Sequence, residues 1–184
     1  MVFIFQALSA NARAQKASKI LVAYFSWSGN AKAMAEQIAG ETGGQLFEIK
    51  TVQAYPDAYD ECLDVAKKEK KDKARPALAS IVPNMADYDI VFLCYPNWWG
   101  TFPMGVFTFL ETHDLSGKTV YPLVTHGGSR FGSSLNDIKK VSPKIELGEA
   151  IHVSAFDRDP KKPPTVSIPN SSVADWLAKL GYKR

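Results

Sequence analysis

The sequence has little of several features that mark common classes of protein. It contains only two cysteines, Cys62 and Cys94, which lie far apart and form no Cys-x-x-Cys motif, so nothing supports a zinc site or a thioredoxin-type pair of thiols. The glycine patterns Gly-x-x-x-x-Gly-Lys-Ser/Thr and Gly-x-Gly-x-x-Gly are also absent, which argues against a site for a nucleoside triphosphate or a dinucleotide. No apolar run is long enough for a membrane span.

A basic surface suited to nucleic acid is missing as well. The formal net charge is +3, and residues 67–75 alone contain six basic residues against two acidic ones. This segment has no aromatic residue and mixes Lys with Glu and Asp, a pattern more typical of a solvated helix than of a nucleic-acid interface. We therefore expect no nucleic-acid partner.

The first residues leave two alternatives open. Residues 2–10 form a short apolar run, and residues 12–15, Ala-Arg-Ala-Gln, have the small side chains of a cleavage site, but no basic segment precedes them. Either residues 1–18 are an extension ahead of the first strand, which suits a cytoplasmic protein, or residues 1–14 are the remnant of a signal peptide, which suits a periplasmic or exported one.

The rest of the chain alternates predicted strands with predicted helices. With 184 residues, 46% of them hydrophobic and 22% charged, it suits one domain with a sizeable core. The predicted strands are residues 19–25, 46–51, 89–95, 118–125 and 145–154, and the predicted helices are residues 30–41, 55–73, 102–112, 133–140 and 173–180. Such alternation predicts a three-layer, doubly wound α/β fold with a parallel five-stranded sheet.

Two proline-containing segments have no predicted helix or strand. Residues 75–85 read as irregular, and residues 157–169, with four prolines, are expected to wrap over the surface. In a doubly wound sheet, ligands bind at the carboxyl ends of the strands. The loops that follow three of the strands are therefore the candidate site.

The first loop has the composition of a phosphate site. Two hydroxyls, a glycine and successive backbone N–H groups stand at a helix N-terminus, where a phosphate is stabilised. Its candidate residues are Ser26, Trp27, Ser28, Gly29, Asn30 and Ala31. The alternative is that Ser28 or Asn30 only caps the helix.

The second loop places two adjacent indoles at the same edge of the sheet. A planar aromatic ligand can stack on one of them, with neighbouring amide and backbone groups facing its polar rim. The alternative is that both indoles only cover the core. The candidate residues are Pro96, Asn97, Trp98, Trp99, Gly100 and Thr101.

The third loop is rich in glycine, which permits close approach of backbone N–H groups to a ligand. Its candidate residues are Thr125, His126, Gly127, Gly128, Ser129, Arg130, Phe131 and Gly132. His126 and Arg130 either place positive charge beside a reduced ligand or make ordinary loop hydrogen bonds. The other histidines, His113 and His152, have no nearby ligand-type partner and are expected to be structural or exposed, and no metal site is expected.

These motifs resemble those of the short-chain flavodoxins and flavodoxin-like proteins. The resemblance is carried by Ser26-x-Ser28-Gly29-Asn30, by residues 95–101 and by Gly127-Gly128-Ser129, and it covers roughly residues 19–180. It implies a single flavodoxin-like domain over residues 19–184 that holds FMN without a covalent bond. The first loop would then bind the phosphate, the second would cover the isoalloxazine, and the third would line its pyrimidine side.

The resemblance also bears on individual residues. It implies that Trp98 or Trp99 stacks on the flavin and that Gly100 lies near the flavin N5. Two features depart from the family pattern: Ala31 stands where threonine is common, and the chain is slightly basic where flavodoxins are usually acidic. From the residues themselves, Cys94 is expected in the core. Tyr55 and Tyr59 either cover the edge of a ligand or, as their i, i+4 spacing favours, pack together within a helix.

Three functions remain distinct at this point. The leading one is a flavodoxin-type electron carrier that works with redox partner proteins, which Trp98 and Trp99 favour because they leave little room for a stacked substrate. The second is an FMN-dependent NAD(P)H:quinone-type oxidoreductase, with a pocket built by residues 55–85. The third is a domain that keeps the fold and has lost the flavin. The oligomeric state stays open.

Overall fold

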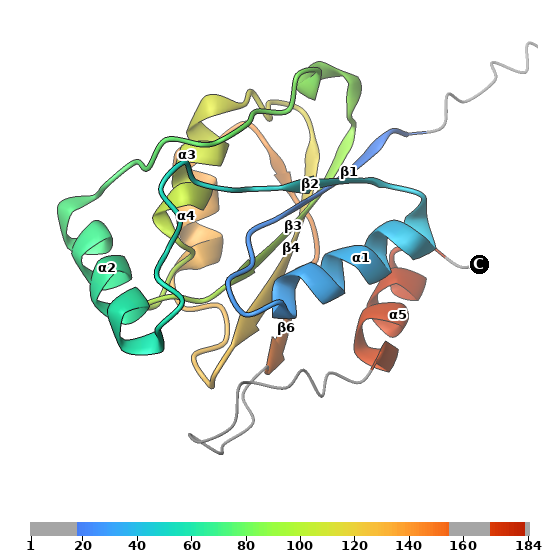
Figure 1. Cartoon of the computed structure of the whole chain (residues 1–184). Coiled ribbons are helices and arrows are strands. Elements are labelled where there is room, and N and C mark those ends of the chain that lie inside the picture. Colours follow the sequence, from blue (N-terminus) through green and yellow to red (C-terminus); the bar gives the residue numbers. More distant parts are fainter. Residues whose placement is uncertain (1–17, 155–169, 183–184) are drawn as a thin grey trace, which may run out of the picture.

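Parallel strands form the centre of the molecule (Figure 1). The computed structural model describes residues 18–154 and 170–182. The sheet has the order β2-β1-β3-β4, and both β5 and β6 pair with the outer side of β4. Its strands are β1 (Ile20–Tyr24), β2 (Gln45–Glu48), β3 (Ile90–Pro96), β4 (Thr119–His126), β5 (Glu146–Leu147) and β6 (Ile151–Ser154).

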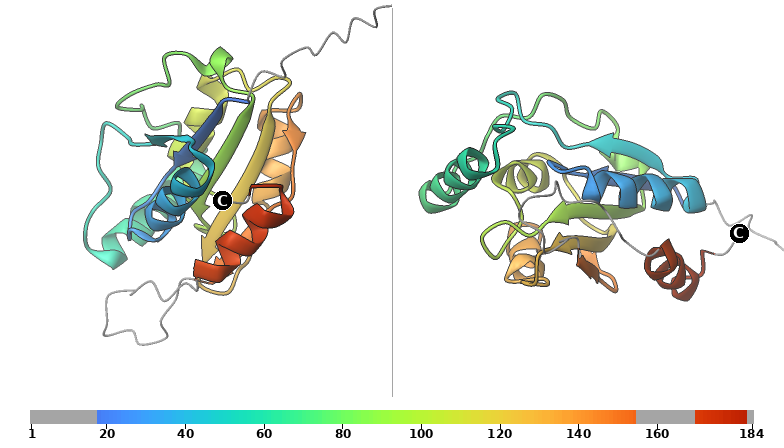
Figure 2. Two further views of the ribbon diagram at one scale, coloured as in Figure 1. Left: turned by 90° about the vertical axis from the view of Figure 1, so that its right-hand side faces the viewer. Right: turned by 60° about the horizontal axis from the view of Figure 1, so that its bottom comes forward.

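The helices cover both faces of this sheet, as the predicted three-layer fold requires (Figure 2). One face packs against α1 and α5, and the other packs against α3 and α4. The helices are α1 (Asn30–Thr42), α2 (Tyr59–Asp72), α3 (Met104–Thr112), α4 (Ser134–Val141) and α5 (Asn170–Lys179), with a 3₁₀ turn at η1 (Met85–Asp87).

The central strands are apolar on both sides because both sides are covered. In β1, Val22 faces the core under α1 and α5, whereas Leu21 and Ala23 face the core under α3. Side chains alternate across a strand, so a strand buried on both faces needs an uninterrupted apolar run. Cys94 in β3 is fully buried in the first of these cores, as expected from the sequence.

The fifth predicted strand is the part of the fold that needs correction, because residues 145–154 form two short strands. The Gly148 N–H donates to the Val120 carbonyl at 2.9 Å, so Pro122, two residues on, turns its backbone toward the same edge. Proline has no N–H to continue the ladder. Gly148 is also tightly placed, since a Cβ there would overlap the Tyr121 ring.

Helix α2 begins later than predicted and stands apart from the sheet. The predicted helix 55–73 starts only at Tyr59, and it lies beside α3 at one side of the molecule (Figure 1). The chain after it, residues 75–85, is irregular as predicted, apart from a bridge between Thr51 and Leu78 and the start of η1.

Two predictions concern segments outside the described residues. These are the alternatives for the N-terminal segment, residues 1–18, of which only residue 18 is described, and the surface wrap at residues 157–169. Among the helices that the structure describes, none has the length and apolar character needed to cross a bilayer.

Candidate functional site

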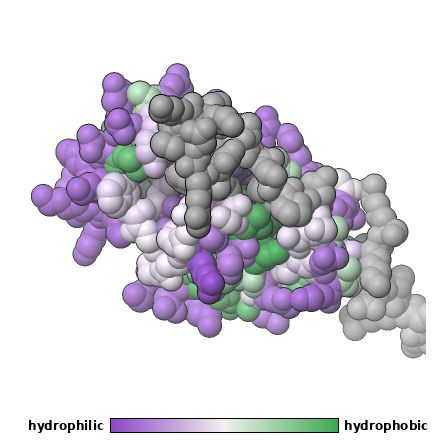
Figure 3. Space-filling view, turned by 90° about the horizontal axis from the view of Figure 1, so that it is seen from below, coloured by the Kyte–Doolittle hydropathy of each residue, from purple (hydrophilic) through white to green (hydrophobic). Residues whose placement is uncertain are grey.

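The three candidate loops follow β1, β3 and β4, so they meet at the carboxyl end of the sheet. This end lies toward the bottom of Figure 1, where the loop after β1 leads into α1. Figure 3 views the molecule from below: among its coloured residues, hydrophobic ones form small separate patches between hydrophilic ones.

The first loop leaves the N-terminus of α1 open. The N-cap is Gly29, with φ +88°, and within the described chain no side chain caps the helix. The capping role considered for Ser28 and Asn30 is therefore not what the structure shows. Ser26 Oγ and Asn30 Oδ1 are buried and have no hydrogen-bond partner among the described residues. Buried polar atoms are nearly always paired, so this loop is built to meet a polar group.

Ala31 is a candidate residue of the first loop whose side chain lies in the core. It is 1% exposed and packs with Met34 and Ile38 in the core beneath α1. Its side chain therefore belongs to the core, and only its backbone N–H remains a candidate for contact with a ligand.

Trp27 connects the first loop to the start of α2. Its Nε1–H donates to the Pro56 carbonyl at 2.8 Å, and its ring lies 6.1 Å from that of Tyr59. Tyr59 is the first residue of α2, and from there it contacts the candidate loop.

Trp98 stands in a group of aromatic rings at the same end of the sheet. It is half-buried and makes edge-to-face contacts with Phe25 at 5.4 Å and with Tyr55 at 5.1 Å. Tyr55 in turn donates its hydroxyl to Glu69 Oε2 at 2.6 Å. Burial, followed by this hydrogen bond and the nearby carboxylate, raises the pKa of Tyr55 well above its usual range.

Trp99 and Gly100 form the centre of a tight turn. The backbone N–H of Trp98 donates to the Thr101 carbonyl at 2.7 Å, and the Thr101 N–H donates back at 3.2 Å. Trp99 has φ +53° and Gly100 has φ +88°. Positive φ at both central positions is typical of a two-residue type I′ turn, in which a residue as bulky as tryptophan is strained.

Helix α2 holds Trp99 in this turn. The indole Nε1–H donates to the Leu63 carbonyl at 3.2 Å, and Lys67 Nζ lies 5.3 Å from the ring centre. Lys70 Nζ donates to the Trp99 carbonyl. Despite these contacts, Trp99 is 43% exposed, so the indole still offers surface to a ligand.

The second and third loops are joined through Asn97 and Gly100. Asn97 Oδ1 accepts from the Gly100 N–H at 3.0 Å, and its Nδ2–H donates to the Arg130 carbonyl at 2.8 Å. The Gly100 carbonyl accepts the Ser133 N–H at 2.7 Å and its hydroxyl at 3.1 Å. Gly132, with φ +54°, has no room for a Cβ, which would strike that same carbonyl.

Asp137 is a residue of this site that the sequence reasoning missed. Its Oδ2 accepts the hydroxyl of Thr101 at 2.8 Å and that of Ser133 at 2.6 Å. Nothing in the sequence distinguishes Asp137 from an ordinary acidic residue in the first turn of a helix. Its role depends on which loop lies over that turn.

His126 makes hydrogen bonds within its loop, which was one of the two roles predicted for it. It is 8% exposed, its Nδ1 accepts the Gly128 N–H at 2.8 Å, and its Nε2 lies 3.0 Å from His152 Nδ1. Burial, then the neighbouring His152 and Arg130, lower the pKa of His126. The expectation that His152 lacks a partner is wrong, whereas His113 is structural as expected, between the Val82 N–H and the Phe109 carbonyl.

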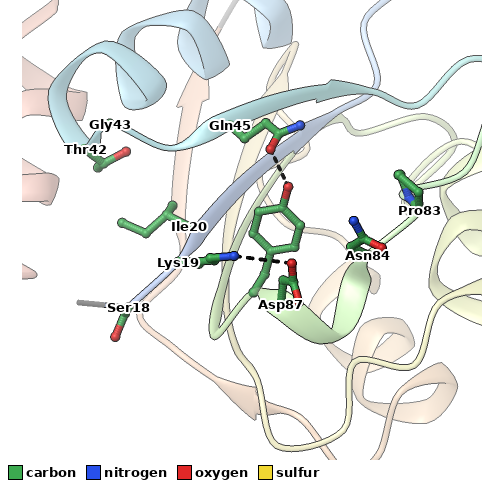
Figure 4. A pocket seen from close by; sticks show the side chains of 10 residues that line it. Ser18, Lys19, Ile20, Thr42, Gly43, Gln45, Pro83, Asn84 and Asp87 are labelled. Carbon is green, nitrogen blue, oxygen red and sulfur yellow. Dashed lines mark hydrogen bonds and ion pairs between the residues drawn. The ribbon is translucent and has the colours of Figure 1, made fainter. Parts of the chain in front are cut away.

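The structure thus brings the three predicted loops to one end of the sheet, while a pocket of about 460 Å³ lies at the opposite end. Figure 4 shows that four of the polar side chains of this pocket form two pairs: Lys19 with Asp87 at 3.3 Å, and Tyr88 with Gln45 at 2.5 Å. The carboxyl end is therefore the better candidate for a functional site.

Comparison with known proteins connects this site to one family. A family model described as flavodoxin matches residues 19–157. No curated protein sequence matches the chain.

Solved structures agree with this match. A protein from Bacteroides eggerthii, described as a candidate flavoprotein, is 35% identical, with a TM-score of 0.73 and coverage of 90% of this chain and 99% of that one. A second candidate flavoprotein, from Bacteroides uniformis, is 28% identical, with a TM-score of 0.75 and coverage of 88% and 98%. A Lactobacillus acidophilus flavoprotein in complex with FMN shares the fold at 22% identity, with a TM-score of 0.66 and coverage of 74% and 93%.

Proposed function

The chain belongs to the flavodoxin family, and we propose that it binds one FMN, without a covalent bond, where the loops after β1, β3 and β4 meet. The observation that carries the proposal is the uncapped N-terminus of α1. There, Ser26 Oγ is buried without a partner in the described part of the chain. The presence of FMN in a solved structure that shares the fold supports the same cofactor.

The first loop would hold the phosphate of FMN. A helix N-terminus carries partial positive charge and free N–H groups, which stabilise a phosphate. The Ser26 hydroxyl is available to donate, and the first turn of α1 contains no acidic residue that would repel the ligand. Binding by uncharged donors suits a phosphate monoester that must be held while the ring carries out redox chemistry.

Trp99 is the better of the two indoles for stacking on the isoalloxazine. It is 43% exposed and held in a fixed orientation by α2, so a flavin ring can cover it at little conformational cost. Trp98 instead packs between Phe25 and Tyr55 and supports the site from behind.

Trp99→Ala should therefore raise the Kd for FMN by about tenfold or more, since stacking contributes about 0.5–1.5 kcal/mol beyond the buried area. Trp98→Ala is the matched control, and its main effect should be on the free energy of unfolding. Fluorescence titration and urea unfolding measure the two quantities. The reverse pattern would assign the stacking role to Trp98.

We further propose that the protein is an electron carrier. FMN supplies one- or two-electron chemistry when bound, and the protein sets its potential through stacking, hydrogen bonds and nearby charge. Lys67 and Lys70 flank Trp99 on the exposed side of α2. Because charge complementarity steers redox encounters, this rim fits a partner protein with an acidic surface.

The test is a titration of the purified protein with FMN, followed under anaerobic conditions by a chemical reductant and, separately, by NAD(P)H. A carrier shows a bound flavin spectrum that the reductant bleaches and NAD(P)H alone leaves unchanged. Rapid bleaching by NAD(P)H would instead support the oxidoreductase. A protein that retains no flavin would overturn the proposal of FMN binding.

A further inference from the structure

The third loop is tied to a pair of histidines from two neighbouring strands. His126 ends β4, and His152 lies in β6, which pairs with β4 in parallel. Two hydrogen bonds run in series: the Gly128 N–H donates to His126 Nδ1 at 2.8 Å, and His126 Nε2 lies 3.0 Å from His152 Nδ1. The Phe131 ring packs edge-on against His152 at 4.9 Å.

These contacts fix the protons on both rings. A backbone N–H can only donate, so Nδ1 of His126 carries no proton. In its neutral form, His126 therefore carries its proton on Nε2 and donates it to His152 Nδ1. His152 accepts at Nδ1, so its own proton is on Nε2. The chain from Gly128 to His152 is complete when both rings are neutral.

A further proton breaks this chain wherever it is added. A proton on His126 Nδ1 points at the Gly128 N–H, so two donors face each other and this hydrogen bond is lost. A proton on His152 Nδ1 points at the Nε2–H of His126, so again two donors face each other and the bond between the rings is lost. If the His126 proton moves from Nε2 to Nδ1 instead, the bond between the rings is kept and the bond with Gly128 is lost. Each site of proton uptake by the pair therefore removes one of its two hydrogen bonds.

We propose that the His126–His152 pair is a proton-sensitive latch on the third loop. It holds Gly128 in its binding conformation while both rings are neutral, and it releases Gly128 when a proton occupies His126 Nδ1, either by direct uptake or because the His126 proton moves there when His152 is protonated. The inference rests on the proposed function, because the loop that the latch holds is the one assigned to FMN. Protonation of the pair then weakens FMN binding by removing the tie that orders the loop.

The groups around the pair act in the same direction. Among the residues that the structure describes, the charged and titratable groups that act on His126 are His152, from β6, and Arg130, from the loop itself. Both disfavour a positive charge on His126, as does its burial, and together they lower the pKa of that ring. Gly128 has φ +126°, a conformation that residues with a side chain rarely adopt, so the loop depends on its hydrogen bonds for its shape.

The first arm of the test is NMR of the imidazole nitrogens and the Gly128 amide in the full chain without FMN, from pH 8 to pH 4.5. We expect the Nε2–H form on both rings at high pH, and a change in the Gly128 amide with the same midpoint as the pair. A His126 ring that titrates while the Gly128 amide stays constant would overturn the latch. This arm needs no flavin, so it still decides the latch if the protein binds none.

The second arm is the Kd for FMN at pH 7.5 and pH 5, in the wild type, His126→Asn and His126→Leu. The asparagine oxygen can accept from Gly128 and does not titrate, whereas leucine provides no acceptor. The phosphate of FMN titrates near pH 6 and affects all three alike, so the comparison between variants is the readout.

The latch predicts a rise in Kd on acidification that is about fivefold or more larger in the wild type than in His126→Asn, the lower range of typical coupling between sites. His126→Leu should bind weakly at both pH values. Identical pH curves for the wild type and His126→Asn would overturn the proposal, as would tight binding by His126→Leu.

Discussion

At the amino end of the sheet, four polar side chains around the pocket form two pairs, whereas at the carboxyl end several polar groups of the described chain have no partner or lie in strained turns. Lys19 pairs with Asp87 and Tyr88 pairs with Gln45 around the pocket of Figure 4. At the other end, Ser26 Oγ has no partner within the described chain, and Trp99 and Arg130 both have positive φ.

This difference indicates which end of the molecule is shaped for a ligand. Unpaired buried groups and left-handed non-glycine residues lower stability, and they persist where the surrounding structure holds them for a function. A pocket alone does not identify that end, because the charged side chains and the tyrosine at the amino-end pocket already have partners there.

The largest difference is expected between two glycines with positive φ. Gly132→Ala, at the carboxyl end, places a methyl group against the Gly100 carbonyl, and should lower the free energy of unfolding by at least about 3 kcal/mol and abolish FMN binding. Gly117→Ala, at the amino end, has open space around the new methyl and should lower it by only about 1–2 kcal/mol. Urea unfolding checks both values, and equal losses would contradict the comparison.

A second pair compares two asparagines. Asn97→Ala removes hydrogen bonds to both Gly100 and Arg130, and should cost about 1–3 kcal/mol of stability while weakening FMN binding. Asn84→Ala, beside the amino-end pocket, removes an exposed side chain and should change stability by less than about 0.5 kcal/mol. If Asn97→Ala is equally silent, Asn97 does not join the two loops.

The third pair consists of two hydroxyl deletions, one of which should change FMN affinity and the other the free energy of unfolding. Ser26→Ala removes an unpartnered hydroxyl, so the stability without FMN should hardly change, while the Kd for FMN rises by about five- to tenfold. The Kd for riboflavin, which lacks the phosphate, should change less. Tyr88→Phe should do the opposite, lowering stability by about 1 kcal/mol with FMN affinity unchanged. Equal loss of FMN and riboflavin would remove the phosphate role.

The smallest effect is a dependence on pH that both ends share. Burial lowers the pKa of His113 at the amino end and of His126 at the carboxyl end, from an ordinary value of 6.5. Below about that pH, the unfolded chain takes up protons that the folded chain does not, so the free energy of unfolding falls as the pH falls. Urea titrations between pH 7.5 and pH 5 test this, and a rising profile on acidification would refute it.

The sequence predicted much of this arrangement, because local patterns determine it. Apolar runs located β1, β3 and β4, and glycine-rich loops after them located the three candidate segments at one end of the sheet. The break between β5 and β6 was not predictable in the same way, because it depends on the direction in which Pro122 faces its neighbouring strand.

Contacts between distant segments account for the rest. Nothing local connects His126 with His152 or Thr101 with Asp137, since each pair forms only once the strands and helices have assembled. Tyr55 was assigned to helix packing by its spacing, yet it precedes α2 and contacts Trp98 instead. These residues were identified only from the folded chain.

Helix α2 is attached to the site through Trp99. It contacts the strained turn through the Leu63 carbonyl, Lys67 and Lys70. Other contacts of this helix with the site are those of Tyr59 with Trp27 and of Glu69 with Tyr55. Such an element opens locally at a lower free energy than the central strands do. Ligand binding that fixes the turn should therefore slow amide hydrogen exchange along α2, making this helix a remote reporter of occupancy.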